Sequence, residues 1–183
     1  MGASALQPEL TIAVALLSVG TLGNAVADPP KFGLGTALTK DAAAPFDIEI
    51  RPDGTGLPAG SGTVKAGETL FAQSCAACHG AKGEHPISSS IRLTGGMGTL
   101  ATPAAVQTVG SYWPYATTLY DYIHRAMPFN APQSLSPDQV YAVTAYVLYL
   151  NGIVPETQVL DAASLPQVQM PNRNGFVTAD PAK

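Results

Sequence analysis

The sequence predicts an all-α domain flanked by two long, largely irregular arms. A motif of two cysteines and a histidine lies within residues 63–152, together with segments whose apolar side chains recur at helical spacing. Proline and glycine, with 16 and 18 copies, punctuate residues 28–62 and 153–183 and disfavour regular structure there. With residues 1–27 as a separate leader, the chain divides into four parts.

The leader has the features of an export signal. An apolar run extends from Ile12 to Leu22, and the small residues of a cleavage site follow and end at Ala27. The polar flank carries Glu9 but no lysine or arginine, which is atypical of such signals. Because the apolar run is short for a membrane span, we expect a signal peptide cleaved after Ala27, export to the bacterial periplasm and no permanent membrane anchor.

The N-terminal arm, residues 28–62, contains one alternating stretch from Phe46 to Ile50, which predicts a strand or an extended contact. A connection of this length without regular structure is either a flexible leader or a segment that lies on another molecule. The apolar residues Phe32, Phe46 and Ile48 favour the second possibility.

The first helix of the domain is predicted from Val64 to about Ala77. Thr63 precedes it and supplies an N-cap hydroxyl. We expect Phe71 to face the core and Gly67 to allow another helix to approach closely, because glycine has no side chain.

This helix ends in Cys75-Ala76-Ala77-Cys78-His79. Two cysteines three apart, followed directly by a histidine, are what covalent attachment of a c-type haem requires. Positions three and four apart share a helical face, so both sulfurs and the imidazole converge on one ligand. Cys75 and Cys78 would hold the porphyrin as thioethers while His79 binds the iron from one side. The sequence therefore predicts one covalent haem c.

Two other interpretations of the motif, a dithiol redox pair and a zinc site, are less well supported. A dithiol redox pair expects a βαβ pattern, and none flanks these cysteines. A zinc site that recruited His79 and His85 beside two thiolates would be cramped. Haem c is favoured because the chain has two cysteines in total and both lie inside the motif.

The sixth ligand of the iron is predicted at Met127. Apolar residues at spacings of three and four indicate a short helix from residue 117 or 118, with a threonine as its cap. This helix should end at Met127, because Pro128 disfavours helical geometry in the residue before it. A thioether ligand raises the reduction potential relative to two imidazoles.

Other side chains compete for this position less well. Met97 lies in a glycine-rich loop, residues 80–98, too soon after His79 to cross the porphyrin easily. His124 is the alternative from the same helix, although its place beside Arg125 suits a surface or supporting role. Met170 would need a long return path. The role of Trp113, in core packing or in a hydrogen bond to the haem propionates, stays open.

The last helix has the clearest boundaries. Ser136 is its cap, Pro137 its first residue, and Gln139 completes a capping box. Its apolar stripe predicts one buried face, and we expect Tyr146 to meet Phe71 where the first and last helices cross. The stripe consists of Val140, Val143, Val147 and Leu150.

The C-terminal arm, residues 153–183, is too apolar for a plain disordered tail. We expect it to lie on a partner together with the N-terminal arm. A formal net charge of −4 and 12% charged residues give no basic footprint, so nucleic acid is not an expected partner.

The domain resembles class I cytochromes c in its cysteine motif, its Met127-Pro128 turn and its terminal helix. A narrower resemblance is to the cytochrome subunit of Sox-type sulfane dehydrogenase and of periplasmic sulfite dehydrogenases. It runs through residues 51–54, 57–62, 110–115, 121–129, 133–135, 140–146 and 171–176.

The resemblance implies an electron-transfer subunit that is not catalytic by itself. A molybdenum-cofactor subunit would oxidise the sulfur compound and pass electrons singly to this chain. Cys75 and Cys78 would anchor the haem, His79 and Met127 would be its axial ligands, and a second cytochrome is a suitable downstream acceptor. Nothing in the sequence resembles a molybdenum site.

Two departures from the family pattern stand out. Sox-type subunits often carry a second haem domain, whereas this sequence has one motif. Ile91 occupies the place where class I cytochromes tend to have a proline whose carbonyl fixes the haem imidazole. Two functions are alternatives to that of a dehydrogenase subunit. The first is a diffusible mono-haem electron carrier, and the second, less favoured, is a haem enzyme of the peroxidase or thiosulfate-oxidising type.

Overall fold

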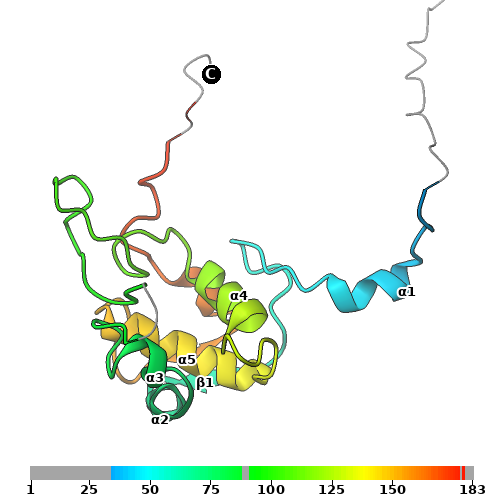
Figure 1. Cartoon of the computed structure of the whole chain (residues 1–183), viewed down its shortest axis with the longest axis horizontal. Helices are drawn as coiled ribbons and strands as arrows, with labels where there is room; N and C mark the ends of the chain where they lie inside the picture. The colour runs from blue at the N-terminus through cyan, green and yellow to red at the C-terminus, as the bar shows by residue number, and fades with distance from the viewer. Residues whose placement is uncertain (1–33, 88–90, 178, 180–183) are drawn as a thin grey trace, which may run out of the picture. The chain divides into compact units, whose positions relative to one another are not determined.

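A computed structural model describes residues 34–87, 91–177 and 179, so the expected signal peptide and Phe32 lie outside the described residues. Residues 34–38 contain no helix or strand and are exposed; the described residues from Thr39 onward form a separate compact unit. Figure 1 shows its elements: α1 (Lys40–Ala43), η1 (Ala44–Phe46), β1 (Ser61–Thr63), α2 (Val64–Ser74), α3 (Ala76–His79), α4 (Ala116–Ala126), α5 (Pro137–Leu150), β2 (Val159–Asp161) and η2 (Leu165–Gln167).

The core is built where α2 crosses α5. Figure 1 shows α2 nearly end-on while α5 runs across the view. A Cβ at Gly67 would lie 1.9 Å from the carbonyl oxygen of Ala142, so only glycine permits this approach. Phe71 and Tyr146 meet at the crossing, with ring centroids 5.4 Å apart. Both expectations for this crossing are confirmed.

Helix α5 is buried more completely than its stripe predicts. The capping box is present, since Ser136 Oγ accepts from the N–H of Gln139 and the Gln139 side chain accepts from the N–H of Ser136. However, every residue from Val140 to Leu148 is buried. The expectation of a single buried face is wrong because segments of both arms cover the rest of the helix.

The two arms meet in a small sheet that the sequence pattern did not indicate. Strands β1 and β2 pair antiparallel, with Gly62 opposite Leu160. Gly62 lies directly against α5, where a Cβ would be 2.0 Å from the amide nitrogen of Ala142. The all-α expectation is confirmed for the helices of the domain, and the flanking segments add a two-stranded sheet that was not predicted.

Much of each arm belongs to the core of this chain. Ile50, Leu160, Leu165 and Met170 are buried in the same apolar cluster as the helices. The expectation that the arms lie on a partner is wrong for these four side chains. Polar contacts fix the N-terminal arm as well, since the Tyr141 hydroxyl donates to the carbonyl of Pro58 at 2.9 Å.

Three element boundaries differ from the prediction. Helix α2 ends at Ser74, and Cys75, with φ −122° and ψ −36°, separates it from α3. Helix α4 begins at Ala116 with Tyr115 as an N-cap that makes no side-chain cap bond, and the expected cap Thr117 lies inside the helix, where its hydroxyl donates to the carbonyl of Pro52. Residues 46–50 contain no strand. Within the described ranges, no helix is long and apolar enough to cross a membrane.

Candidate haem site

The cysteine motif occupies a single helical turn. The N–H groups of Cys78 and His79 both donate to the carbonyl of Cys75, at 3.1 and 3.0 Å, which closes the turn of α3. Gly80 ends it with φ +81°, and a Cβ there would lie 2.4 Å from the carbonyl oxygen of His85. This turn brings Cys75, the N-cap of α3, close in the fold to Cys78 and His79 at its end, as the spacing predicts.

The two cysteines are free and differ in their surroundings. Cys75 is half-buried and packs against the apolar core, whereas Cys78 is exposed. Burial raises the pKa of the Cys75 thiol to about 11, because the thiolate would lose its hydration. Neither cysteine is joined to another residue, so both remain available for thioether bonds.

The surroundings of His79 suit a metal ligand. The residue is half-buried, and its Nδ1 is fully buried without a hydrogen-bond partner among the described residues. A buried polar atom without a partner is costly in a finished fold. The free thiols and this imidazole are the donor set that a covalently held haem requires, so the residues present fit the group.

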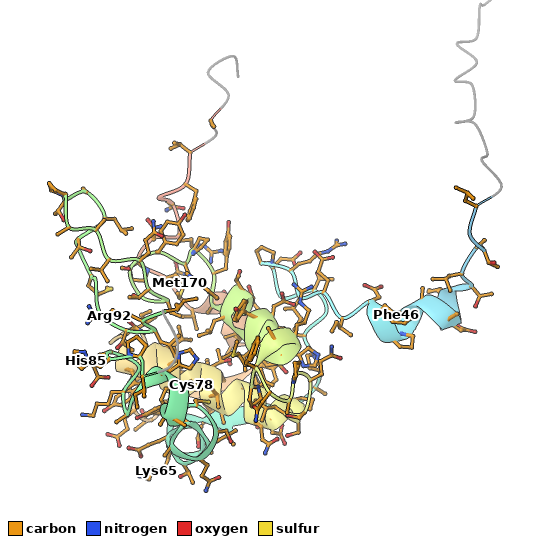
Figure 2. The ribbon with its side chains drawn as sticks, in the orientation of Figure 1. Phe46, Lys65, Cys78, His85, Arg92 and Met170 are labelled. Carbon is orange, nitrogen blue, oxygen red and sulfur yellow. The ribbon has the colours of Figure 1, made fainter. Side chains whose placement is uncertain are left out.

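Two hydrogen bonds hold the loop after His79 to the rest of the domain. The N–H of Ile87 donates to the carbonyl of Cys78 at 2.9 Å, and the amide of Asn151, at the end of α5, donates to the carbonyl of Leu93 at 3.1 Å. Figure 2 shows Cys78 on α3, with His85 and Arg92 in this loop. The expected glycine-rich loop contains no helix or strand over its described residues, 80–87 and 91–98, and Ser88 to Ser90 lie outside the described residues.

Met127 stands where the sequence predicts the helix break. It is the C-cap of α4, in extended geometry with φ −120° and ψ 148°, and its N–H donates to the carbonyl of Ile123 at 3.1 Å. Its side chain is half-buried against the core, as are those of Leu93 and Trp113. Because the Met127 side chain is only partly buried, its thioether sulfur is accessible to a group that packs against this part of the core.

The competing side chains lie in other settings. Met97 is 48% exposed, while Met170 is buried in the core, so neither resembles the half-buried Met127. His85 is exposed. His124 is half-buried rather than a plain surface residue, and its Nδ1 is buried without a partner among the described residues.

Trp113 packs edge-on against Tyr122, with ring centroids 5.8 Å apart. It also contacts the buried core, so core packing accounts for its position without a bond from its indole N–H. Within the described part of the chain, no three His, Cys, Asp or Glu side chains gather as a metal site.

Asp121 is a supporting residue that the sequence reasoning did not single out. It is buried on α4, its Oδ1 accepts from the N–H of Ile50 at 3.1 Å, and its Oδ2 pairs with the guanidinium of Arg125. One carboxylate thus ties the N-terminal arm to the helix that ends at Met127. The available signal was the spacing of four residues between Asp121 and Arg125, which allows an ion pair on one helical face.

Comparison with known proteins decides the family. The cytochrome c family model matches residues 64–151. The chain is 47% identical to a chain in the crystal structure of the sulfane dehydrogenase SoxCD from Paracoccus pantotrophus, with a TM-score of 0.75, and the match covers 82% of this chain and 73% of that one. The chain belongs to the cytochrome c family.

A second solved structure is more distant from this cytochrome c. It is the as-isolated form of thiosulfate dehydrogenase TsdBA from Marichromatium purpuratum, 26% identical over 47% of this chain and 17% of that one, with a TM-score of 0.34. That score is too low to support a comparison of folds. The resemblance to a sulfane dehydrogenase subunit stands on the first match, and the family implies covalent haem c and a role in electron transfer.

Proposed function

We propose that Cys75 and Cys78 anchor one haem c and that His79 and Met127 are its axial ligands. Support comes from the single turn of α3, from the buried and unpartnered Nδ1 of His79, and from the half-buried Met127 at the end of α4. A bound haem supplies one-electron redox chemistry. With two side chains of the protein on the iron, no axial position is left for a substrate.

The protein then serves as the electron-transfer subunit of a periplasmic dehydrogenase for sulfur compounds. It receives electrons from a molybdenum-containing subunit that oxidises sulfite or sulfane sulfur, and passes them to an acceptor such as another cytochrome. The observation that carries this proposal is the 47% identity to a chain of sulfane dehydrogenase SoxCD over 82% of this chain. By itself, this chain supplies no substrate chemistry.

The test is purification of the tagged, haem-loaded protein from the periplasm of its own host. We expect a molybdenum-containing subunit to copurify in fixed stoichiometry, and the cytochrome spectrum to become reduced when the partner's substrate is added. Adding sulfite, or a sulfane-carrying protein, in separate assays identifies that substrate. A cytochrome that purifies alone and is reduced by neither would overturn the subunit role and favour the diffusible carrier.

A further inference from the structure

Residues 39–49, which we call the docking segment, contain two short helices and no fully buried residue. Thr39 caps α1, since its Oγ1 accepts a hydrogen bond from the N–H of Ala42 at 3.2 Å. The N–H of Asp47 donates to the carbonyl of Ala44 at 3.2 Å and closes η1. Neither short helix contains a buried residue, and Phe46 is 81% exposed. Helices of this length are marginal in water without packing, so a surface that covers the segment would stabilise it.

The docking segment ends at a firm anchor. Ile50 follows it directly, is buried, and donates its N–H to Asp121 of α4 at 3.1 Å. Helix α4 has Met127 as its C-cap. A partner held by the segment is therefore tethered to the helix that carries the proposed sixth ligand, which suits a partner that exchanges electrons with this domain.

Charge and sequence similarity indicate which partner this is. The segment carries Asp41, Asp47 and Glu49 against Lys40, and the whole chain has a formal net charge of −4. A second copy of the chain would therefore bring like charges together. The similarity to the sulfane dehydrogenase chain covers 82% of this chain and so extends well beyond the family domain at residues 64–151. Flanking sequence shared with a dehydrogenase chain favours a contact with the dehydrogenase subunit.

We propose that the docking segment binds an apolar groove with a basic rim on the molybdenum-containing subunit, with Phe46 as its anchor. This inference rests on the proposed function. Aromatic side chains that fill a pocket carry a large share of the free energy of binding. The three carboxylates would speed association and make it sensitive to salt.

The test compares two variants of the haem-loaded protein, Phe46→Asp and Val177→Asp. Val177 is 88% exposed in the other arm and is the matched control. Because Phe46 is similarly exposed, its replacement should leave the visible spectrum and the thermal midpoint unchanged. We expect Phe46→Asp to weaken binding to the purified molybdenum-containing subunit by about 30-fold or more, and Val177→Asp to change it by less than about threefold.

The outcomes separate this inference from the function on which it rests. A stable complex in which Phe46→Asp binds as tightly as the unmodified chain would overturn the docking segment while the subunit role stands. Equal weakening by both variants would also overturn it, because the effect would not belong to residues 39–49. If the unmodified chain forms no complex with a molybdenum-containing subunit, the proposed function fails and the docking segment fails with it.

Discussion

In the proposed haem site, Met127 is the residue whose loss would open an axial position of the iron. Replacing it by alanine should remove the sulfur-to-iron bands from the visible spectrum of the oxidised protein. The reduction potential should fall by a measurable part of the roughly 0.8 V range that axial ligands span. Optical spectroscopy and potentiometric titration check both effects.

Met97→Ala is the matched control for this experiment. Met97 lies in the loop after the haem motif and is 48% exposed, so its removal should leave the spectrum and the potential as they were. An unchanged spectrum in Met127→Ala would show that another side chain is the sixth ligand, with His124 as the next to replace.

Asp121 is the one carboxylate of α4, and it joins this helix to the N-terminal arm. It accepts the N–H of Ile50 and pairs with Arg125 while it is itself buried. Asp121→Ala leaves a buried donor unsatisfied and should lower the free energy of unfolding by about 1–3 kcal/mol. Urea unfolding followed by circular dichroism measures the loss. Asp41→Ala, on exposed α1, should stay within about 0.5 kcal/mol of the unmodified protein, and an equal loss in both variants would contradict this role.

At the scale of elements, the close crossing of α2 and α5 depends on Gly67. A methyl group there would meet the backbone of α5 at Ala142, and backbone does not move aside easily. Gly67→Ala should therefore cost about 1–3 kcal/mol in the free energy of unfolding, although alanine is the better helix former.

Gln73→Ala provides the comparison for this crossing, since Gln73 is exposed on the same helix. It should change the free energy of unfolding by no more than about 0.5 kcal/mol. If the two variants unfold at the same denaturant concentration, α2 and α5 can separate without cost and the crossing is looser than the structure shows.

The helices were predictable because their signals are local. The start of α5 is fixed by its sequence neighbours Ser136, Pro137 and Gln139. Pro128 likewise ends α4 at Ala126, with Met127 as the C-cap. The cysteine motif is equally local and forms one helical turn, although the break at Cys75 that separates α3 from α2 was not predicted. Sequence similarity to a sulfane dehydrogenase subunit also followed from short, recognisable segments, and the comparison with SoxCD confirms it.

The arms were not predictable in the same way, because their partners are distant in the chain. Gly62 pairs with Leu160, and Ile50 donates to Asp121, across separations that no local pattern encodes. Apolar residues in an irregular arm indicate that these side chains are buried, but they do not indicate which surface covers them. We predicted that these residues are buried against another protein, whereas Ile50, Leu160, Leu165 and Met170 are buried in the core of this chain.

At the scale of the whole molecule, the C-terminal arm is part of the stability of the domain. Leu160 and Leu165 are fully buried, so Leu160→Ala should cost about 2–5 kcal/mol in the free energy of unfolding. Val159→Ala, next to it but 47% exposed, should cost about 0.5 kcal/mol or less. Equal unfolding free energies for the two variants would show that β2 does not close the core.

The tyrosines of α4 and α5 make the stability of the molecule fall at high pH. Burial raises the pKa values of Tyr120 and Tyr146, and it raises that of Tyr141 to about 12. In the unfolded chain a tyrosine titrates near its ordinary pKa of about 10. Between these values the native state retains protons that the unfolded state has lost, so stability is intact below about pH 10 and declines as pH rises toward 12.

Tyr141→Phe tests this pH dependence directly. At neutral pH the variant should be less stable by about 0.5–1.5 kcal/mol, because the hydroxyl no longer donates to the carbonyl of Pro58. Phenylalanine does not ionise, so the difference in unfolding free energy between the two proteins should shrink from pH 10 to 12. Urea unfolding at intervals across this range measures it, and a constant difference would mean that Tyr141 ionises as easily in the fold as in the unfolded chain.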